Sequence, residues 1–424
     1  MAKDLLRERL AKYTPPKERW TPVDEALYGV DDIYNVPEGK AKKLRKNAIR
    51  YSFAHHYNNK FYHEYCKQNN VSPDDIKNEE DFKKIPLIPS SFFKDHPPAG
   101  PDFIKWLRNI YTGKLPEIEL SARPTYDEII EKLEEKGIIM THSSGSTGEF
   151  TFIPRDQITL SRLIYSVHST WFNLAGIDSS IYYISITPDP RYNFMTACVC
   201  QKGVYDIFDN AYFAIEQKLS LQSKGSDRYV SNFSSIIERI RANSQSGKKS
   251  LVVSVPLVIK MLSEEIAKTG NLILPQGSFV LVSGGSKDEE GKIIKKSDLV
   301  EDIENALGIP PHNVRDMYMA AECNSLLFSC EGGFMHIPQT LMEPFVLDEE
   351  MEPLPYGSEG RFAFLDPTPN SYPGFIATDD KVKFLDHCPV CDRPGPVIEP
   401  PITRMPGAED RGCARAMGKL LQGI

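Results

Sequence analysis

The chain contains the segment Thr141-His142-Ser143-Ser144-Gly145-Ser146-Thr147-Gly148-Glu149-Phe150, which decides how the rest of the sequence is interpreted. Hydroxyl groups and accessible backbone N–H groups gathered in one turn are what a loop needs to hold nucleotide phosphates. The residues before it (137–140) and after it (149–153) have the apolar run and the alternation typical of short strands. The segment therefore predicts a phosphate-binding loop between two strands, and the alternative is a Ser/Gly-rich hairpin turn without a ligand.

The same residues exclude a Walker loop. That loop needs Gly-Lys followed by Ser or Thr and then a helix, whereas here Gly148 is followed by Glu149 and a strand pattern. Backbone N–H and hydroxyl groups, without a lysine, would have to hold the phosphates.

Composition and charge limit the class of protein. The chain has 424 residues, 41% hydrophobic and 25% charged, which is ordinary for a globular protein with two or more subdomains. The net charge of −8, without a basic tract, argues against a nucleic-acid partner. The first residues form a charged helix rather than a signal peptide, and no apolar run approaches the ~18 residues of a membrane span. We therefore expect a cytoplasmic protein.

Helix and strand patterns alternate through the middle of the chain, which predicts an α/β fold with mostly parallel strands. The predicted helices cover residues 126–135, 157–173, 226–242, 256–268 and 298–307. The predicted strands cover residues 181–186, 251–255, 278–283 and 314–319. Before them, the prolines of 85–94 predict a stiff extended linker, and after Gly333 the pattern changes to short strands and Pro/Gly turns.

Three segments follow predicted strands, where ligands bind in such sheets. They are the 143–148 loop, Gly284-Gly285-Ser286 and the segment from Tyr318 to Glu322. In that order they would supply phosphate donors, a close backbone approach for a nucleotide ring and a carboxylate for Mg²⁺. Each also has a structural explanation: a turn at the start of a helix for the glycines, and a surface carboxylate for Glu322.

Taken in order, these segments resemble the adenylate-forming ligases. That superfamily has a Ser/Thr-Ser-Gly-Thr-Thr-Gly phosphate loop, a glycine-bearing adenine loop, an aromatic-x-x-Thr-Glu segment and a ribose-binding aspartate. The matching segments here are Ser143–Gly148, Ser283–Ser286, Tyr318–Glu322 and Thr378-Asp379-Asp380. The similarity is greatest to the phenylacetate–CoA ligase-like branch, and especially to LuxE-type acyl-protein synthetases. It is carried by residues 85–89 with Phe93-Lys94, 364–367, 371–376 and 407–414.

The resemblance implies the α/β fold of an adenylate-forming ligase N-terminal domain, in which layered α/β sheets are joined by a small β-rich subdomain. Four parts are expected: a helical N-terminal extension (1–80), an α/β adenylation core with the phosphate loop (81–332), a β-rich subdomain with a zinc knuckle (333–403) and a short C-terminal tail (404–424). The tail would replace the usual C-terminal lid domain.

The resemblance also implies a two-step reaction in which ATP and Mg²⁺ activate a carboxylic acid, most simply a fatty acid, before the acyl group passes to a thiol. Glu322 would bind Mg²⁺, Arg404 would touch ribose or phosphate, and Arg155 is a candidate phosphate contact. The implied nucleotide-binding residues are Ser143, Ser144, Gly145, Ser146, Thr147, Gly148, Ser283, Gly284, Gly285, Tyr318, Ala321 and Asp380.

Cys413 is the candidate acyl acceptor. Gly412 and Ala414 leave its sulfur accessible, while Arg411 and Arg415 favour the nucleophilic thiolate. On sequence context alone, the alternative is an ordinary small residue in a C-terminal helix.

Other cysteines predict a structural Zn²⁺ site. Cys388 and Cys391 have the spacing of a zinc knuckle, and Cys330 and His336 would complete a closed tetrahedral set. His387 or Cys323 is an alternative ligand, and a reduced, metal-free turn is the alternative to a site. Cys66, Cys198 and Cys200 lie on apolar patterns and are expected in the core. His142 either faces a carboxylate pocket or ends its strand with a hydrogen bond.

The leading functional hypothesis is an acyl-protein synthetase that loads its own Cys413, with an acyl-reductase as a partner protein. The second is an acyl- or aryl-CoA ligase that uses CoA without the full lid domain. The third is an inactive nucleotide- and zinc-binding module that acts through partners.

Overall fold

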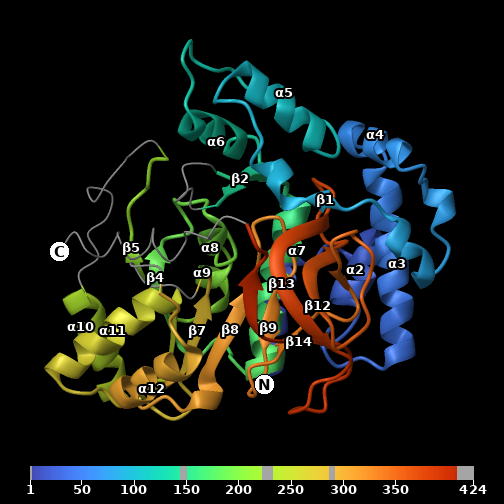
Figure 1. Ribbon diagram of the computed structural model, residues 1–424. Helices are drawn as coiled ribbons and strands as arrows, with labels where there is room; N and C mark the ends of the chain where they lie inside the picture. The colour runs from blue at the N-terminus through green and yellow to red at the C-terminus, as the bar shows by residue number, and fades with distance from the viewer. Residues whose placement is uncertain (1, 144–149, 222–232, 286–291, 408–424) are drawn as a thin grey trace.

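One sheet of twelve strands runs through the part of the chain that the structure describes (Figure 1). Its strand order is β11-β12-β13-β14-β10-β9-β8-β7-β6-β4-β5, and β1 pairs with β13 off this path. The structure is a computed structural model that describes residues 2–143, 150–221, 233–285 and 292–407. Within these residues, no helix is both long and apolar enough to cross a bilayer.

Five neighbouring strands form the parallel half of the sheet, β4–β8. They are β4 (Tyr182–Pro188), β5 (Ala211–Ile215), β6 (Ser250–Ser254), β7 (Phe279–Ser283) and β8 (Val314–Tyr318). Runs such as Leu251-Val252-Val253 are apolar at every position because both faces of the sheet are covered there. Three helices gather beside these strands at one end of the molecule (Figure 1): α10 (Phe233–Gln245), α11 (Pro256–Thr269) and α12 (Lys296–Leu307).

The remaining strands of the main path form the antiparallel half, β9–β14. They are β9 (Leu327–Ser329), β10 (Met335–His336), β11 (Glu343–Leu347), β12 (Glu359–Leu365), β13 (Phe375–Leu385) and β14 (Val397–Arg404). The β-rich pattern expected after Gly333 is therefore present, and its strands continue the same sheet as the parallel half.

The strands on either side of the expected phosphate loop form a separate two-stranded sheet. β2 (Ile139–His142) pairs antiparallel with β3 (Phe152–Arg155), from Ile139 opposite Arg155 to His142 opposite Phe152. The helix α7 (Gln157–Ala175) follows at once, because Asp156 caps its first turn and Gly176 ends it in the left-handed conformation. Three shorter helices precede or follow this pair of strands in the chain: α6 (Tyr126–Glu134) before it, and α8 (Thr196–Val199) and α9 (Val204–Ile207) after α7 and β4.

The N-terminal part is helical, as expected. Its helices are α1 (Ala2–Leu10), α2 (Pro22–Tyr28), α3 (Glu38–His56), α4 (Lys60–Gln68) and α5 (Pro101–Ile110). Short 3-10 helices occupy Ala11–Tyr13, Lys17–Arg19, Pro73–Asp75, Glu79–Lys84, Ser90–Phe93 and Pro311–Asn313. A buried ion pair joins α2 to α7, with Arg162 Nε 2.9 Å from Asp24 Oδ1.

The predicted helices and strands are confirmed, with shifts of no more than three residues at the ends that the structure describes. The linker prediction for residues 85–94 is wrong in one respect. Ile88 and Pro89 are extended, as the prolines require, but they form β1 and pair with Ile376 and Ala377 of β13. The segment is therefore part of the sheet rather than a free connection.

Candidate functional site

The expected phosphate loop is anchored at both of its described ends. The Ser143 hydroxyl accepts a hydrogen bond from Thr151 N (2.9 Å), and Ser143 N donates to Thr151 O (3.0 Å). His96 Nε2 donates to Phe150 O at 2.9 Å. The other predicted loop residues, Ser144, Gly145, Ser146, Thr147 and Gly148, lie outside the described residues, as does Cys413.

His142 uses its ring to close the end of β2. Its Nδ1 donates to Ser143 O at 2.8 Å, and burial lowers the pKa of the imidazole to about 4. A neutral ring that donates to its own neighbour's carbonyl matches the second of the two sequence interpretations, in which His142 ends the strand with a hydrogen bond.

Three predicted nucleotide residues from different strands meet at Asp380. The Asp380 carboxylate is buried on β13; Tyr318 at the end of β8 donates its hydroxyl to Oδ2 at 2.7 Å. Arg404 at the end of β14 lies opposite Asp380 in the ladder and donates Nη1 to Oδ1 at 3.0 Å. The guanidinium offsets the buried negative charge. The Tyr318 hydroxyl and the Arg404 guanidinium thus bind both oxygens of the Asp380 carboxylate and fix its orientation.

The predicted adenine segment begins beside this cluster. Ser283 ends β7 and lies opposite Met317 of β8, one residue before Tyr318. Gly284 has φ +100°, a backbone conformation that favours glycine. The carboxyl ends of the neighbouring strands β7 and β8 therefore place Ser283, Gly284 and Gly285 near the Tyr318–Asp380 pair, at the position where ligands bind in parallel sheets.

Glu322 lies in the turn Ala321–Asn324, which we call the Glu322 turn. Side chains from other elements form hydrogen bonds with its backbone. The Glu322 residue is 6% exposed, and its backbone carbonyl accepts from the Tyr372 hydroxyl at 3.0 Å. Arg155 is fully buried and donates Nη2 to Ala321 O (2.8 Å) and to Cys323 O (3.0 Å). The Nε and Nη2 groups of Arg155 thus contact the protein's own turn, a role that the sequence does not predict.

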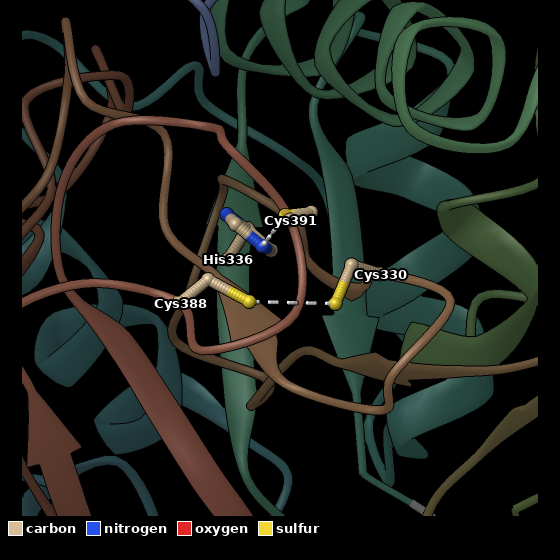
Figure 2. Close-up of side chains that lie close together, drawn as sticks. All are labelled: Cys330, His336, Cys388 and Cys391. Atoms are coloured by element: carbon tan, nitrogen blue, oxygen red, sulfur yellow. Dashed lines mark hydrogen bonds between the residues drawn. The ribbon is translucent and has the colours of Figure 1, made fainter.

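The four predicted zinc ligands form a compact cluster. Their ligand atoms all lie within 4.8 Å of one another, and Figure 2 shows the side chains pointing toward a common centre. Cys330 follows β9, His336 is in β10, and Cys388 and Cys391 lie in the connection between β13 and β14. The contacts are Cys330 Sγ to Cys388 Sγ at 3.8 Å and Cys391 Sγ to His336 Nε2 at 3.3 Å.

These separations fit a tetrahedral ion. Sulfurs about 2.3 Å from a common zinc lie about 3.8 Å apart, whereas a disulfide needs about 2.05 Å. Burial raises the pKa of the Cys330 thiol to about 12 and lowers the pKa of the His336 imidazole to about 4. A buried cation is what would hold such sulfurs as thiolates.

The alternative ligands lie elsewhere. The His387 side chain is 76% exposed and contacts Asp386. Cys323 is a buried residue of the Glu322 turn, and its Sγ donates to Ser325 O. Cys66 and Cys198 are buried, as expected, whereas Cys200 is only half-buried.

Two residues with a clear structural role had no role assigned from the sequence. Asp366 and Tyr372 were noted there only within segments that carry the family resemblance. The structure places both against the Glu322 turn, where Asp366 Oδ2 accepts from Asn324 N at 2.9 Å. Nothing in the local pattern shows this, since the two residues are more than forty positions from the turn, with separations of 42 and 50.

Comparison with solved structures shows the fold. 2-Hydroxyisobutyryl-CoA ligase, in complex with 2-HIB-AMP and CoA, matches 94% of this chain and 74% of its own at a TM-score of 0.64 and 14% identity. The same ligase in its postadenylation state, with 2-HIB-AMP, gives a TM-score of 0.63 at 13% identity, over 94% of this chain and 75% of its own. The mixed α/β fold of adenylate-forming ligases, predicted from the sequence, is confirmed.

Two curated proteins are similar over nearly the whole length. Both are named long-chain-fatty-acid–luciferin-component ligase. The one from Vibrio harveyi is 22% identical over 94% of this chain and 93% of its own length, and the one from Aliivibrio fischeri is 23% identical over 90% and 89%. The family described as acyl-protein synthetase, LuxE, matches residues 129–422. Because that match covers most of the chain, the protein belongs to the LuxE acyl-protein synthetase family.

Proposed function

We propose that this protein activates a long-chain fatty acid with ATP and transfers the acyl group to its own Cys413. The observation that carries the proposal is the meeting of Tyr318, Asp380 and Arg404 at one buried carboxylate, in a chain of the LuxE family. The names of the two curated relatives support a long-chain fatty acid as the substrate.

The first step forms an acyl-adenylate. A carboxylate oxygen of the fatty acid attacks the α-phosphorus of ATP, a new P–O bond forms, and the bond to the β-phosphate breaks to release pyrophosphate. Asp380, with Tyr318 and Arg404 fixing its carboxylate, would accept hydrogen bonds from the ribose hydroxyls. Ser283, Gly284 and Gly285 would lie along the adenine ring, close to Ala321.

The phosphates would be held by hydroxyls of Ser143, Ser144, Ser146 and Thr147 and by backbone N–H groups of Gly145 and Gly148. Mg²⁺, when bound, neutralises charge on the departing pyrophosphate. Mg²⁺ is usually held by one or two carboxylates together with substrate phosphates. The mostly buried Glu322 fits that requirement as a single carboxylate.

The second step transfers the acyl group. The Cys413 thiolate attacks the acyl carbon, a C–S bond forms, and the C–O bond to AMP breaks. The thioester then needs an acceptor, and we propose an acyl-reductase as the partner protein. The partner proposal is tested by isolating the acylated protein and measuring whether a reductase with reduced nicotinamide removes the acyl group as aldehyde; a chain that stays bound would argue against that partner.

Intact-mass measurement tests the main proposal. Wild type is incubated with ATP, Mg²⁺ and a panel of fatty and aromatic acids, beside Cys413→Ala and a matched cysteine variant, Cys200→Ala. A hydroxylamine-labile acyl adduct on wild type and Cys200→Ala, but absent from Cys413→Ala, is expected. Acid-dependent pyrophosphate release without any adduct would refute self-acylation and move the acceptor to CoA or another external thiol. An adduct that survives Cys413→Ala would refute the assignment of the acceptor.

We further propose that Cys330, His336, Cys388 and Cys391 hold a structural Zn²⁺. The fit of the donor separations and the presence of four protein ligands support a closed site, because a catalytic zinc keeps a position open for water.

A further inference from the structure

The Arg155 guanidinium is a buried cation that contacts the Glu322 turn. Arg155 is fully buried at the end of β3, and within the described ranges no carboxylate lies within ion-pair distance of it. Removing a charged group from water is unfavourable, so the hydrogen bonds of the buried Arg155 guanidinium must compensate for its burial. Nε donates to Asn324 Oδ1 at 3.1 Å, and Nη2 donates to the carbonyls of Ala321 and Cys323.

Tyr372 completes the set of contacts. It is fully buried, and its hydroxyl donates to the carbonyl between the two that Arg155 holds, that of Glu322, at 3.0 Å. The Arg155 guanidinium also lies 5.7 Å from the centre of the Tyr372 ring. Two buried side chains from distant parts of the chain therefore hold three consecutive carbonyls, those of Ala321, Glu322 and Cys323.

A buried anion holds the next residues of the turn. Asp366 is fully buried, its Oδ2 accepts from Asn324 N at 2.9 Å, and its Oδ1 accepts from Ser325 Oγ at 3.0 Å. Asn324 thus links the buried Arg155 cation to the buried Asp366 anion, through its side-chain oxygen and its backbone N–H. With carbonyls and N–H groups both committed, the backbone around Glu322 has few ways to move.

We propose that Arg155 and Tyr372 are positioning residues that fix the Glu322 turn, so that the Glu322 carboxylate meets the magnesium of the adenylation step. The role of magnesium in this inference rests on the proposed function. The fixing of the Glu322 turn by Arg155 and Tyr372 does not. Groups that orient a metal ligand typically change metal affinity by about ten- to a hundredfold when removed. General core packing is the competing explanation, and it predicts a loss of stability spread over the whole fold.

Cysteine labelling tests the structural part without nucleotide or metal. Cys323 lies inside the Glu322 turn and Cys66 lies in α4, and both are fully buried. Alkylation rates at the two thiols, separated by peptide mass, are measured for wild type, Arg155→Met and Tyr372→Phe. Loss of these hydrogen bonds is expected to raise the rate at Cys323 about tenfold and to change Cys66 less than twofold.

Equal acceleration at both cysteines would show general destabilisation and overturn the proposal, as would an unchanged rate at Cys323. Tyr372→Phe removes one hydroxyl and keeps the ring, so it decides the question even where Arg155→Met fails to fold.

Magnesium dependence tests the functional part. The Mg²⁺ concentration for half-maximal pyrophosphate release is expected to rise about tenfold in Tyr372→Phe, while KM for the fatty acid changes less than twofold. The control is Tyr62→Phe, because Tyr62 is equally buried and its hydroxyl donates to Pro86 O at 2.8 Å, away from the turn. An unchanged magnesium dependence in Tyr372→Phe, or an equal rise in Tyr62→Phe, would overturn this part. Wild type that releases no pyrophosphate with any acid would refute the proposed function alone, and the labelling result would still decide the structural part.

Discussion

The parallel half of the sheet and the region around the predicted zinc ligands are stabilised in different ways. In the parallel half, aliphatic side chains of the strands pack against α11 and α12 in one large cluster that includes Val252, Leu262 and Ile303. Around the β9–β10 turn and the β13–β14 connection, a separate small cluster holds only Cys330, Cys388 and Val397 with three half-buried neighbours. Apolar area supports the first region. The second region lacks that area, and the four side-chain donors of the proposed zinc site would stabilise it instead.

The first prediction breaks this comparison by removing the metal. Chelation, or Cys388→Ser, is expected to abolish bound zinc and to lower the free energy of unfolding by about 4 kcal/mol, the contribution of a ligand present at about a thousand times its Kd. Elemental analysis and denaturant unfolding measure the two quantities. Cys200→Ala should keep the full metal content, because Cys200 is not in the cluster. Purified protein that contains no metal, and whose free energy of unfolding is the same with and without chelator, would contradict the structural zinc site.

The second prediction tests the parallel half. Leu262→Ala is expected to cost about 3 kcal/mol, since Leu262 in α11 is fully buried and its loss leaves a cavity. Denaturant unfolding measures this cost. The effect of the chelator should be the same in Leu262→Ala as in wild type, because distant sites contribute additively. Coupling between the two changes would show that the α11–α12 cluster and the region around the zinc ligands unfold as one unit.

The third prediction uses acid. His168 is buried against Trp171 and Phe208, and among the described residues neither ring nitrogen has a hydrogen-bond partner. Burial lowers its pKa from 6.5 to about 3, and the charge of Asp206 opposes that shift. The unfolded chain therefore binds the proton first as the pH falls below 6.5, and the folded state loses stability progressively from there toward pH 3.

At pH 5 this loss is about 2 kcal/mol, from about 1.5 pH units at about 1.4 kcal/mol each. His168→Leu should remove that part of the pH dependence, measured by denaturant unfolding between pH 7 and 5. His312→Gln is the control because His312 is exposed. If the free energy of unfolding of His168→Leu depends on pH as in wild type, the unfolding of another element causes the loss of stability in acid.

The smallest effect compares two glycines. Gly333 (φ +83°) lies in the turn after Cys330, and Gly308 (φ +67°) ends α12 in the parallel half. Alanine in the left-handed conformation costs about 1 kcal/mol, so Gly333→Ala should lower stability by that amount. Gly308→Ala should cost at least as much, because its Cβ would also lie 3.1 Å from Ile273 Cγ2. Gly333→Ala alone should also weaken zinc binding, measured by competition with a chelator. The N–H at 333 donates to Cys330 O at 3.0 Å, and a strained alanine would shift that turn. Equal zinc affinity in the two variants would mean that the turn does not shape the metal site.

The sequence determined the elements and their order. The apolar runs at 251–255 and 278–283 predicted strands of a mostly parallel sheet, and the structure has them there. The Cys388-x-x-Cys391 spacing predicted a metal site, and the fold brings the other two candidates to it. These features follow from local periodicity and short spacing, which a sequence shows directly.

The tertiary structure alone decided the contacts between distant residues. Arg155 is adjacent to the expected phosphate loop, and in the fold it holds a turn 169 residues away, at Asn324. The 85–94 segment, expected as a linker, supplies a strand because β13 offers a free edge to pair with. Neither outcome follows from propensity or spacing. A buried guanidinium and a strand edge take the partners that the folded chain brings to them, and those partners lie beyond any local pattern.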